Sequence, residues 1–330
     1  LHSLKDELIA AGLKDMAPLV RVHALRLAEK RLADSAALRR TVSALADDPA
    51  PEGGFQLAFS LGAAPGPELL DAWVRLGARL GADSWLQIAL LSSAASTAPQ
   101  LLGRCVADRD YRAAVSGHRL DLVKKLAQLA ASTGNDADLA RTMDLLKEVG
   151  KAGPAPWQLA VLEGVGQGLL ASNRSLEQLW DQPSKNLAAT LAGLRPVFGE
   201  AARFAQKPGE NLAERQAAIR LLGLGPFAEA EKALPHLLAP QQPLALQLET
   251  VKALSHNCAA NCWKQCWHAS NGSTPCWKPW RKKPFLPANL NPRAWNNCVN
   301  IQTRPCARAP ANCWPARALR TGKKCWPSMK

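Results

Sequence analysis

The sequence predicts an all-α protein built as an α-solenoid, in which helix pairs stack one on the next. Three observations predict this fold. Apolar residues recur at helical spacing through residues 1–255 and never alternate for long. Gly and Pro break the chain between these segments. A short phrase also returns about every thirty residues. Hydrophobic residues make up 47% of the chain but aromatics only 5%, as expected for closely packed helices rich in Ala and Leu.

Local start and stop signals place the individual helices. Pro18 suits the first turn of a helix, and Ser35 suits an N-cap. Asp48 precedes Pro49, and this position disfavours helical backbone, so a helix ends there. The expected helices are Leu4–Ile9, Leu19–Leu32, Ala36–Leu45, Phe55–Leu61, Pro67–Leu80, Ser84–Ala94, Ala98–Val106, Leu120–Ala131, Asp136–Val149, Pro156–Leu170, Leu176–Trp180, Ser184–Ala205, Ala213–Leu222, Ala228–Leu237 and Pro243–Leu254.

The returning phrase is clearest in Phe55-Gln-Leu-Ala-Phe-Ser-Leu, Leu86-Gln-Ile-Ala-Leu-Leu and Trp157-Gln-Leu-Ala-Val-Leu. Aligning all its copies makes one set of positions equivalent: Ala24, Ala58, Ala89, Ala160, Ala218 and Glu249. The gaps between them are 34, 31, 71, 58 and 31 residues, so we expect one weak repeat inside each of the two long gaps. Such a period, with two helices per unit, predicts stacked helix pairs. An irregular helical bundle is the alternative. We expect the repeat alanines to lie where helices approach closely.

The chain resembles HEAT repeats in the phrase around Asp48-Pro49 and Phe55-Gln-Leu-Ala-Phe-Ser-Leu-Gly, in Asp83-Ser-Trp-Leu-Gln-Ile-Ala-Leu-Leu, and in the helix over 120–134. More narrowly, it is similar over about residues 15–255 to the HEAT-like region of large multidomain haem-binding proteins of planctomycetes and their relatives, described as membrane-bound dehydrogenases. The resemblance implies a propeller before this region and a cytochrome c module with a Cys-x-x-Cys-His haem site after it. It also implies export. None of the catalytic or haem residues of that family falls on a position here.

The body offers no grouping typical of catalysis. His23 and His118 stand alone, and Cys105 is expected to be buried and inert. The glycine-rich run Gly164-Val-Gly166-Gln-Gly168 follows a helix and not a strand, so it does not predict a dinucleotide fold. The remaining candidates are interpreted as packing tryptophans or solvated charges: Trp73, Trp85, Trp157, Trp180, Arg39-Arg40 and Lys124-Lys125.

The C-terminal part has a different composition. The last acidic residue is Glu249, and residues 250–330 carry 14 of the 41 Lys and Arg. The preceding part therefore balances 27 basic against 27 acidic residues, and the net charge of +14 belongs to the tail. Eight of the nine cysteines and seven of the eleven tryptophans also lie there: Cys258, Cys262, Cys266, Cys276, Cys298, Cys306, Cys313, Cys325, Trp263, Trp267, Trp277, Trp280, Trp295, Trp314 and Trp326.

Four functional interpretations of the tail were weighed. Zinc sites usually pair cysteines as Cys-x2-Cys, whereas the first three tail cysteines are spaced Cys-x3-Cys-x3-Cys. Haem attachment requires Cys-x-x-Cys-His. The sequence Cys262-Trp-Lys-Gln-Cys266-Trp-His268 has one extra residue between the cysteines and another before the histidine, so it does not match. Nucleic-acid binding would use the mixture of Trp and Lys or Arg, but no known module surrounds it. A disulfide scaffold needs a secretory context, which the sequence does not show.

The sequence thus predicts two parts, a HEAT-like α-solenoid over 1–255 and a largely disordered tail over 256–330. The expected function is a non-catalytic scaffold for protein or interdomain interaction, as a fragment of a larger haem-containing dehydrogenase. The alternative is a nucleic-acid-binding protein that uses the tail. No catalytic, cofactor-binding or metal-binding residue is assigned, and haem c is implied only for the missing module. We expect no membrane span. The residues leave the compartment open, and the resemblance alone implies a periplasmic or exported location.

A frameshift near residues 255–257 explains the tail better than any of these functions. Five tail cysteines are followed directly by tryptophan, and Cys-Trp codons of the form TGC-TGG, taken one base earlier, give NTG-CTG-GNN. These three codons encode Leu, Val or Met, then Leu, then Ala, Gly, Val, Asp or Glu. Such tripeptides are common in residues 1–255. We predict that the minus-one frame of the gene stays open after codon 255 and encodes further acidic, Leu-rich helices. Stop codons in that frame would exclude the frameshift.

Overall fold

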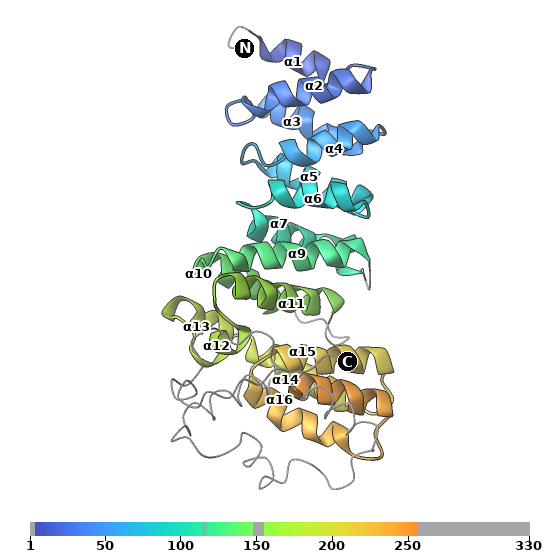
Figure 1. Ribbon diagram of the computed structural model, residues 1–330, viewed down its shortest axis with the longest axis vertical. Coiled ribbons are helices and arrows are strands. Elements are labelled where there is room, and N and C mark those ends of the chain that lie inside the picture. The colour runs from blue at the N-terminus through green and yellow to red at the C-terminus, as the bar shows by residue number, and fades with distance from the viewer. Residues whose placement is uncertain (1–3, 115–116, 148–154, 256–330) are drawn as a thin grey trace, which may run out of the picture.

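The computed structural model describes residues 4–114, 117–147 and 155–255. These residues form α-helices joined by short turns and 3₁₀ segments, with no strand among them. Figure 1 shows an elongated stack, with α1 (Asp6–Gly12) at one end and α16 (Phe227–Ala233) at the other. The expected all-α solenoid is confirmed for this part of the chain. The predicted tail at 256–330 lies outside the described residues.

One column of the stack contains the helices that carry the returning phrase. Each packs against the next in the series, so helices two to four apart in sequence become neighbours in space. The column consists of α2 (Pro18–Glu29), α4 (Pro51–Ser60), α6 (Ser84–Ser93), α9 (His118–Ser132), α11 (Pro156–Ala171), α15 (Leu212–Leu224) and a last helix at residues 244–255.

The second column lies behind the first and begins with α1. Its further members are α3 (Ala36–Ala44), α5 (Pro67–Leu80), α7 (Ala98–Ala107), α10 (Asp136–Asp144) and α13 (Lys185–Ala192). Near the C-terminal end α14 (Arg195–Gln206) packs against α15 and α16. The short connecting segments are η1 (Leu45–Asp47), α8 (Arg109–Arg112), η2 (Leu145–Lys147), α12 (Leu176–Asp181) and η3 (Leu234–Leu238).

Several expected boundaries are correct, and the errors have local causes. Ser35 caps α3 by accepting a hydrogen bond from the Leu38 N–H at 3.3 Å. The helix expected over Ser184–Ala205 is two helices, because the chain turns at Gly193 and Pro196 lies in the first turn of α14. The last expected turn before Leu238 is the 3₁₀ segment η3, which contains Pro235. Proline removes a helical donor and favours such breaks.

The repeat alignment is confirmed in its alanines and corrected in one gap. Ala24, Ala58, Ala89, Ala160 and Ala218 are all buried, as expected for sites of close helix approach. The 71-residue gap holds α9, which continues the column. The 58-residue gap holds no further member, because α11 packs directly on α15. The extra residues there form the short α12 together with α13 and α14.

A glutamine two residues before the repeat position has a role that the sequence interpretation missed. The side-chain amide of Gln87 donates to the carbonyl of Gly81 at 3.3 Å, and that of Gln158 donates to the carbonyl of Leu146 at 3.2 Å. Gln247 donates to the carbonyl of Gln242 at 2.9 Å. Each carbonyl belongs to the loop or helix end before the glutamine's own helix. These side chains therefore satisfy buried backbone acceptors at the turn between paired helices.

The closest helix contact joins α9 and α11. A Cβ atom on Gly164 would lie 2.1 Å from the carbonyl oxygen of Lys124, and one on Gly168 would lie 2.3 Å from that of Gln128. Ala127 of α9 lies opposite, with its Cβ atom 2.9 Å from the position that a Gly164 Cβ would take. The glycine-rich run of the sequence is therefore a helix-packing surface, because only glycine leaves room for this approach.

A buried ion pair fixes the first turn of the stack. The carboxylate of Asp48 accepts two hydrogen bonds from Arg21 of α2, each 2.7 Å long, and a third from the Ala50 N–H at 2.9 Å. Burial alone would raise the pKa of Asp48, but the bonds from Arg21 and Ala50 outweigh it, so the pKa lies below its ordinary value. The pair holds α2 against the turn that begins α4.

We predict that Gly164→Ala lowers the free energy of unfolding by about 1–3 kcal/mol, because the new methyl group forces α9 and α11 apart. The matched control is Gly199→Ala in α14, where a Cβ atom meets nothing within 4 Å. That control should raise stability by up to about 1 kcal/mol through helix propensity. Urea denaturation followed by circular dichroism measures both. Equal midpoints for the two variants would refute the close contact.

We also predict that Asp48→Asn costs about 1–3 kcal/mol at neutral pH, because Arg21 loses a charged partner. The folded-state pKa of Asp48 is depressed, so its contribution is complete above the unfolded pKa of about 3.9 and is lost as pH falls through the lower folded value. Parent and variant should therefore converge in acid. The control is Asp71→Asn, whose pair with Arg104 is half exposed and should cost about 0–1 kcal/mol. A gap that stays constant between neutral pH and pH values below about 3 would contradict this account.

Candidate functional site

The isolated histidines and the cysteine of the body have ordinary structural environments. His23 is exposed on α2. His118, at the start of α9, places its Nε2 atom 3.1 Å from the carbonyl oxygen of Ala78. Cys105 is fully buried, and burial raises the pKa of its thiol far above the ordinary value. Its neighbour Tyr111 donates a hydrogen bond to the Val74 carbonyl at 3.3 Å. The prediction that Cys105 is a buried residue is confirmed.

Three of the four body tryptophans pack as expected. Trp73 is buried and donates its indole N–H to the carbonyl of Leu90 at 2.9 Å. Trp157 is buried beneath the guanidinium of Arg112, which lies 6.0 Å from the ring centre. Trp180 packs edge-on against Phe198 with ring centres 5.3 Å apart. For Trp85 the expectation is wrong, because its side chain is 73% exposed on α6.

Three of the four basic residues that the sequence suggested as solvated, in Arg39-Arg40 and Lys124-Lys125, form hydrogen bonds or an ion pair. Arg39 donates to the carbonyls of Leu32 and Ala33 at 2.7 and 3.0 Å. Lys124 binds the carboxylate of Glu163 on α11 at 2.7 Å, and Lys125 donates to the side chain of Gln87. Arg39 therefore binds the turn before its own helix, whereas the two lysines join α9 to its neighbours in the first column. The lysine contacts were unpredictable because their partners lie about one repeat away in sequence.

Within the described residues, no three His, Cys, Asp or Glu side chains gather closely enough to hold a metal ion. None of the helices described combines the length and the apolar character that crossing a membrane requires. The tail cysteines and histidines lie outside these ranges, so the predictions for them stay predictions.

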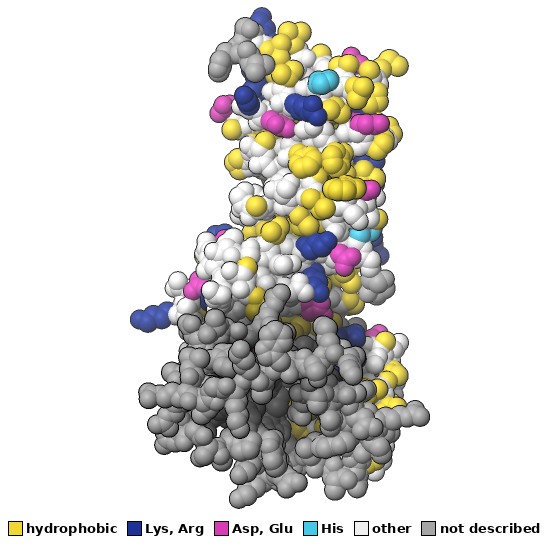
Figure 2. Space-filling view, viewed as in Figure 1, with side chains coloured by type: hydrophobic (Ala, Val, Ile, Leu, Met, Phe, Trp, Pro, Cys, Tyr) yellow, Lys and Arg dark blue, Asp and Glu magenta, His cyan; other side chains and the backbone are white. Residues whose placement is uncertain are grey.

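The most distinctive surface is apolar and crosses three neighbouring helices of the first column. We call it the apolar stripe, and it consists of Leu19, Val20 and Leu27 on α2, Phe55 and Phe59 on α4, and Trp85 and Ile88 on α6. The exposed fractions rise from 38% at Leu27 to 73% at Trp85. Figure 2 shows hydrophobic side chains gathered on this face of the upper stack. Exposed apolar side chains that gather on neighbouring helices mark an interaction surface more often than isolated exposed residues do.

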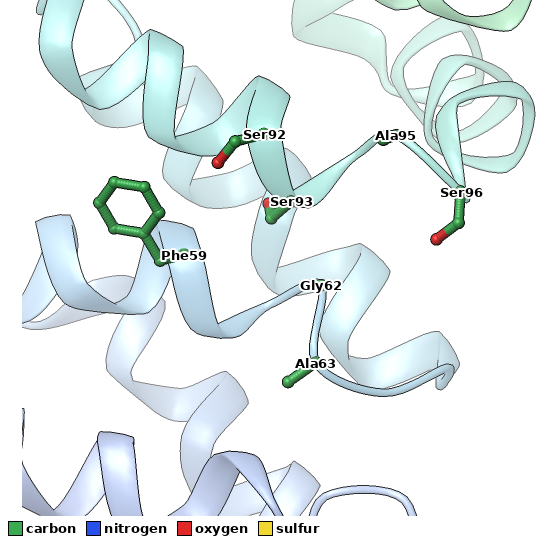
Figure 3. A pocket seen from close by; sticks show the side chains of 7 residues that line it. All are labelled: Phe59, Gly62, Ala63, Ser92, Ser93, Ala95 and Ser96. Atoms are coloured by element: carbon green, nitrogen blue, oxygen red, sulfur yellow. The ribbon is translucent and has the colours of Figure 1, made fainter.

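The stripe contains an ordered pair of rings and a hollow. Phe55 and Phe59 lie one turn apart, with ring centres separated by 5.3 Å in an edge-to-face arrangement. Beyond Phe59, a hollow of about 330 Å³ opens between the ends of α4 and α6. Figure 3 shows Phe59 and Ser92 at its mouth, and the loop residues Gly62 and Ala95 beside them. No charged side chain lines this hollow.

The stripe ends where α9 begins, because the same column then carries polar contacts. Lys125 reaches back to Gln87, and Lys124 reaches forward to Glu163. The sequence pattern did not single out the stripe. Its signal is that Phe59 and Ile88 lie next to the buried Ala58 and Ala89, at positions that a simple amphipathic helix would fill with polar residues.

No model of a known protein family matches the chain, and no curated protein matches it either. What is shown is therefore an all-helical array of stacked helices, with an exposed apolar stripe and a hollow on one column.

Proposed function

We propose that this chain is a non-catalytic helical-repeat scaffold that binds another protein through the apolar stripe. The observation that carries the proposal is that exposed large apolar side chains lie on three neighbouring helices of one column, α2, α4 and α6. Aromatic side chains supply most of the binding free energy in protein interfaces, and Trp85 and the two phenylalanines are of this kind. An exposed apolar stripe promotes aggregation, and a bound partner would prevent this by covering it.

The charge distribution supports a protein partner over nucleic acid for the described body. Residues up to Glu249 carry as many acidic as basic side chains. Many of these cations are occupied: Arg21 by Asp48, Arg31 by Asp6, and Arg174 by Asp136. A nucleic-acid interface needs a surface of free cations to displace counterions from phosphates. The alternative function, nucleic-acid binding through the tail, rests on residues outside the described part.

The resemblance extends the proposal to a parent protein. The phrase Phe55-Gln-Leu-Ala-Phe-Ser-Leu-Gly after Asp48-Pro49 supports a HEAT-like array within a larger haem-containing dehydrogenase. In that setting the array would space the other domains or dock a protein, and haem c would belong to another module. An exported location would follow from the same resemblance. This part of the proposal rests on the resemblance alone.

The test is a selection of displayed peptides against the full-length chain under reducing conditions. We expect the selected peptides to bind the parent and to lose about tenfold or more in affinity for Trp85→Ala or Phe59→Ala, as interface anchors do. Trp85 is 73% exposed and Phe59 46% exposed, so these variants should stay close to the parent's melting temperature and isolate binding from folding. Fluorescence anisotropy of labelled peptides gives the affinities.

Leu170→Ala is the matched control. Leu170 lies on α11 and is 67% exposed, but it is outside the stripe. Its truncation should leave peptide affinity within about twofold of the parent, because singly exposed apolar residues carry little binding energy. Peptides that bind all three variants and the parent alike would refute the stripe as the interaction surface.

A further inference from the structure

We draw no further inference here: the strongest candidate, the apolar stripe across α2, α4 and α6 with the hollow at the C-terminal ends of α4 and α6, is an exposed apolar face, and nothing in the structure shows what covers it.

Discussion

Every helix pair in this protein is stable only because the next pair covers its apolar face. Helices α4 and α6 are ten residues long, and helices of that length are marginal in water on their own. Packing along each column supplies what local propensity lacks, and small residues set how near the helices come. The contact of α9 with α11 is the extreme case, since Gly164 and Gly168 lie against backbone carbonyls with no room for a side chain. A methyl group there would disturb the whole stack on both sides.

Polar contacts keep this packing in register. A buried glutamine at the turn satisfies carbonyls of the preceding helix, as Gln87 and Gln158 do. An ion pair then joins a helix to the next unit, as Arg21 does with Asp48 and Lys124 with Glu163. The glutamine contacts lie within one repeat, whereas the ion pairs link residues about one repeat apart and so join each repeat to its neighbour. Because contacts are confined to adjacent repeats, a solenoid is quasi-one-dimensional.

The same architecture explains why an apolar surface can stay exposed. A helix of the first column is covered by its two neighbours and by the second column, which leaves one side open. On α4 and α6 that side carries Phe55, Phe59, Trp85 and Ile88. The stack does not need these four for its core, because Leu57, Ala58, Leu86 and Ala89 already fill it. The four exposed apolar side chains are not needed for the core and are unfavourable in water. A binding partner would explain them.

The sequence alone determined the helical class, most helix positions, the caps and the burial of the repeat alanines, because all of these depend on residues within a few turns of one another. It also determined the neutrality of the body and the different composition of residues 250–330. The tertiary structure alone decided that α11 packs directly on α15, that Gly164 faces a backbone, and that Trp85 is exposed while Trp73 is buried. A sequence period shows that a side chain lies on an apolar face. Whether that face meets another helix or solvent depends on neighbours some thirty residues away, which only the packed stack specifies.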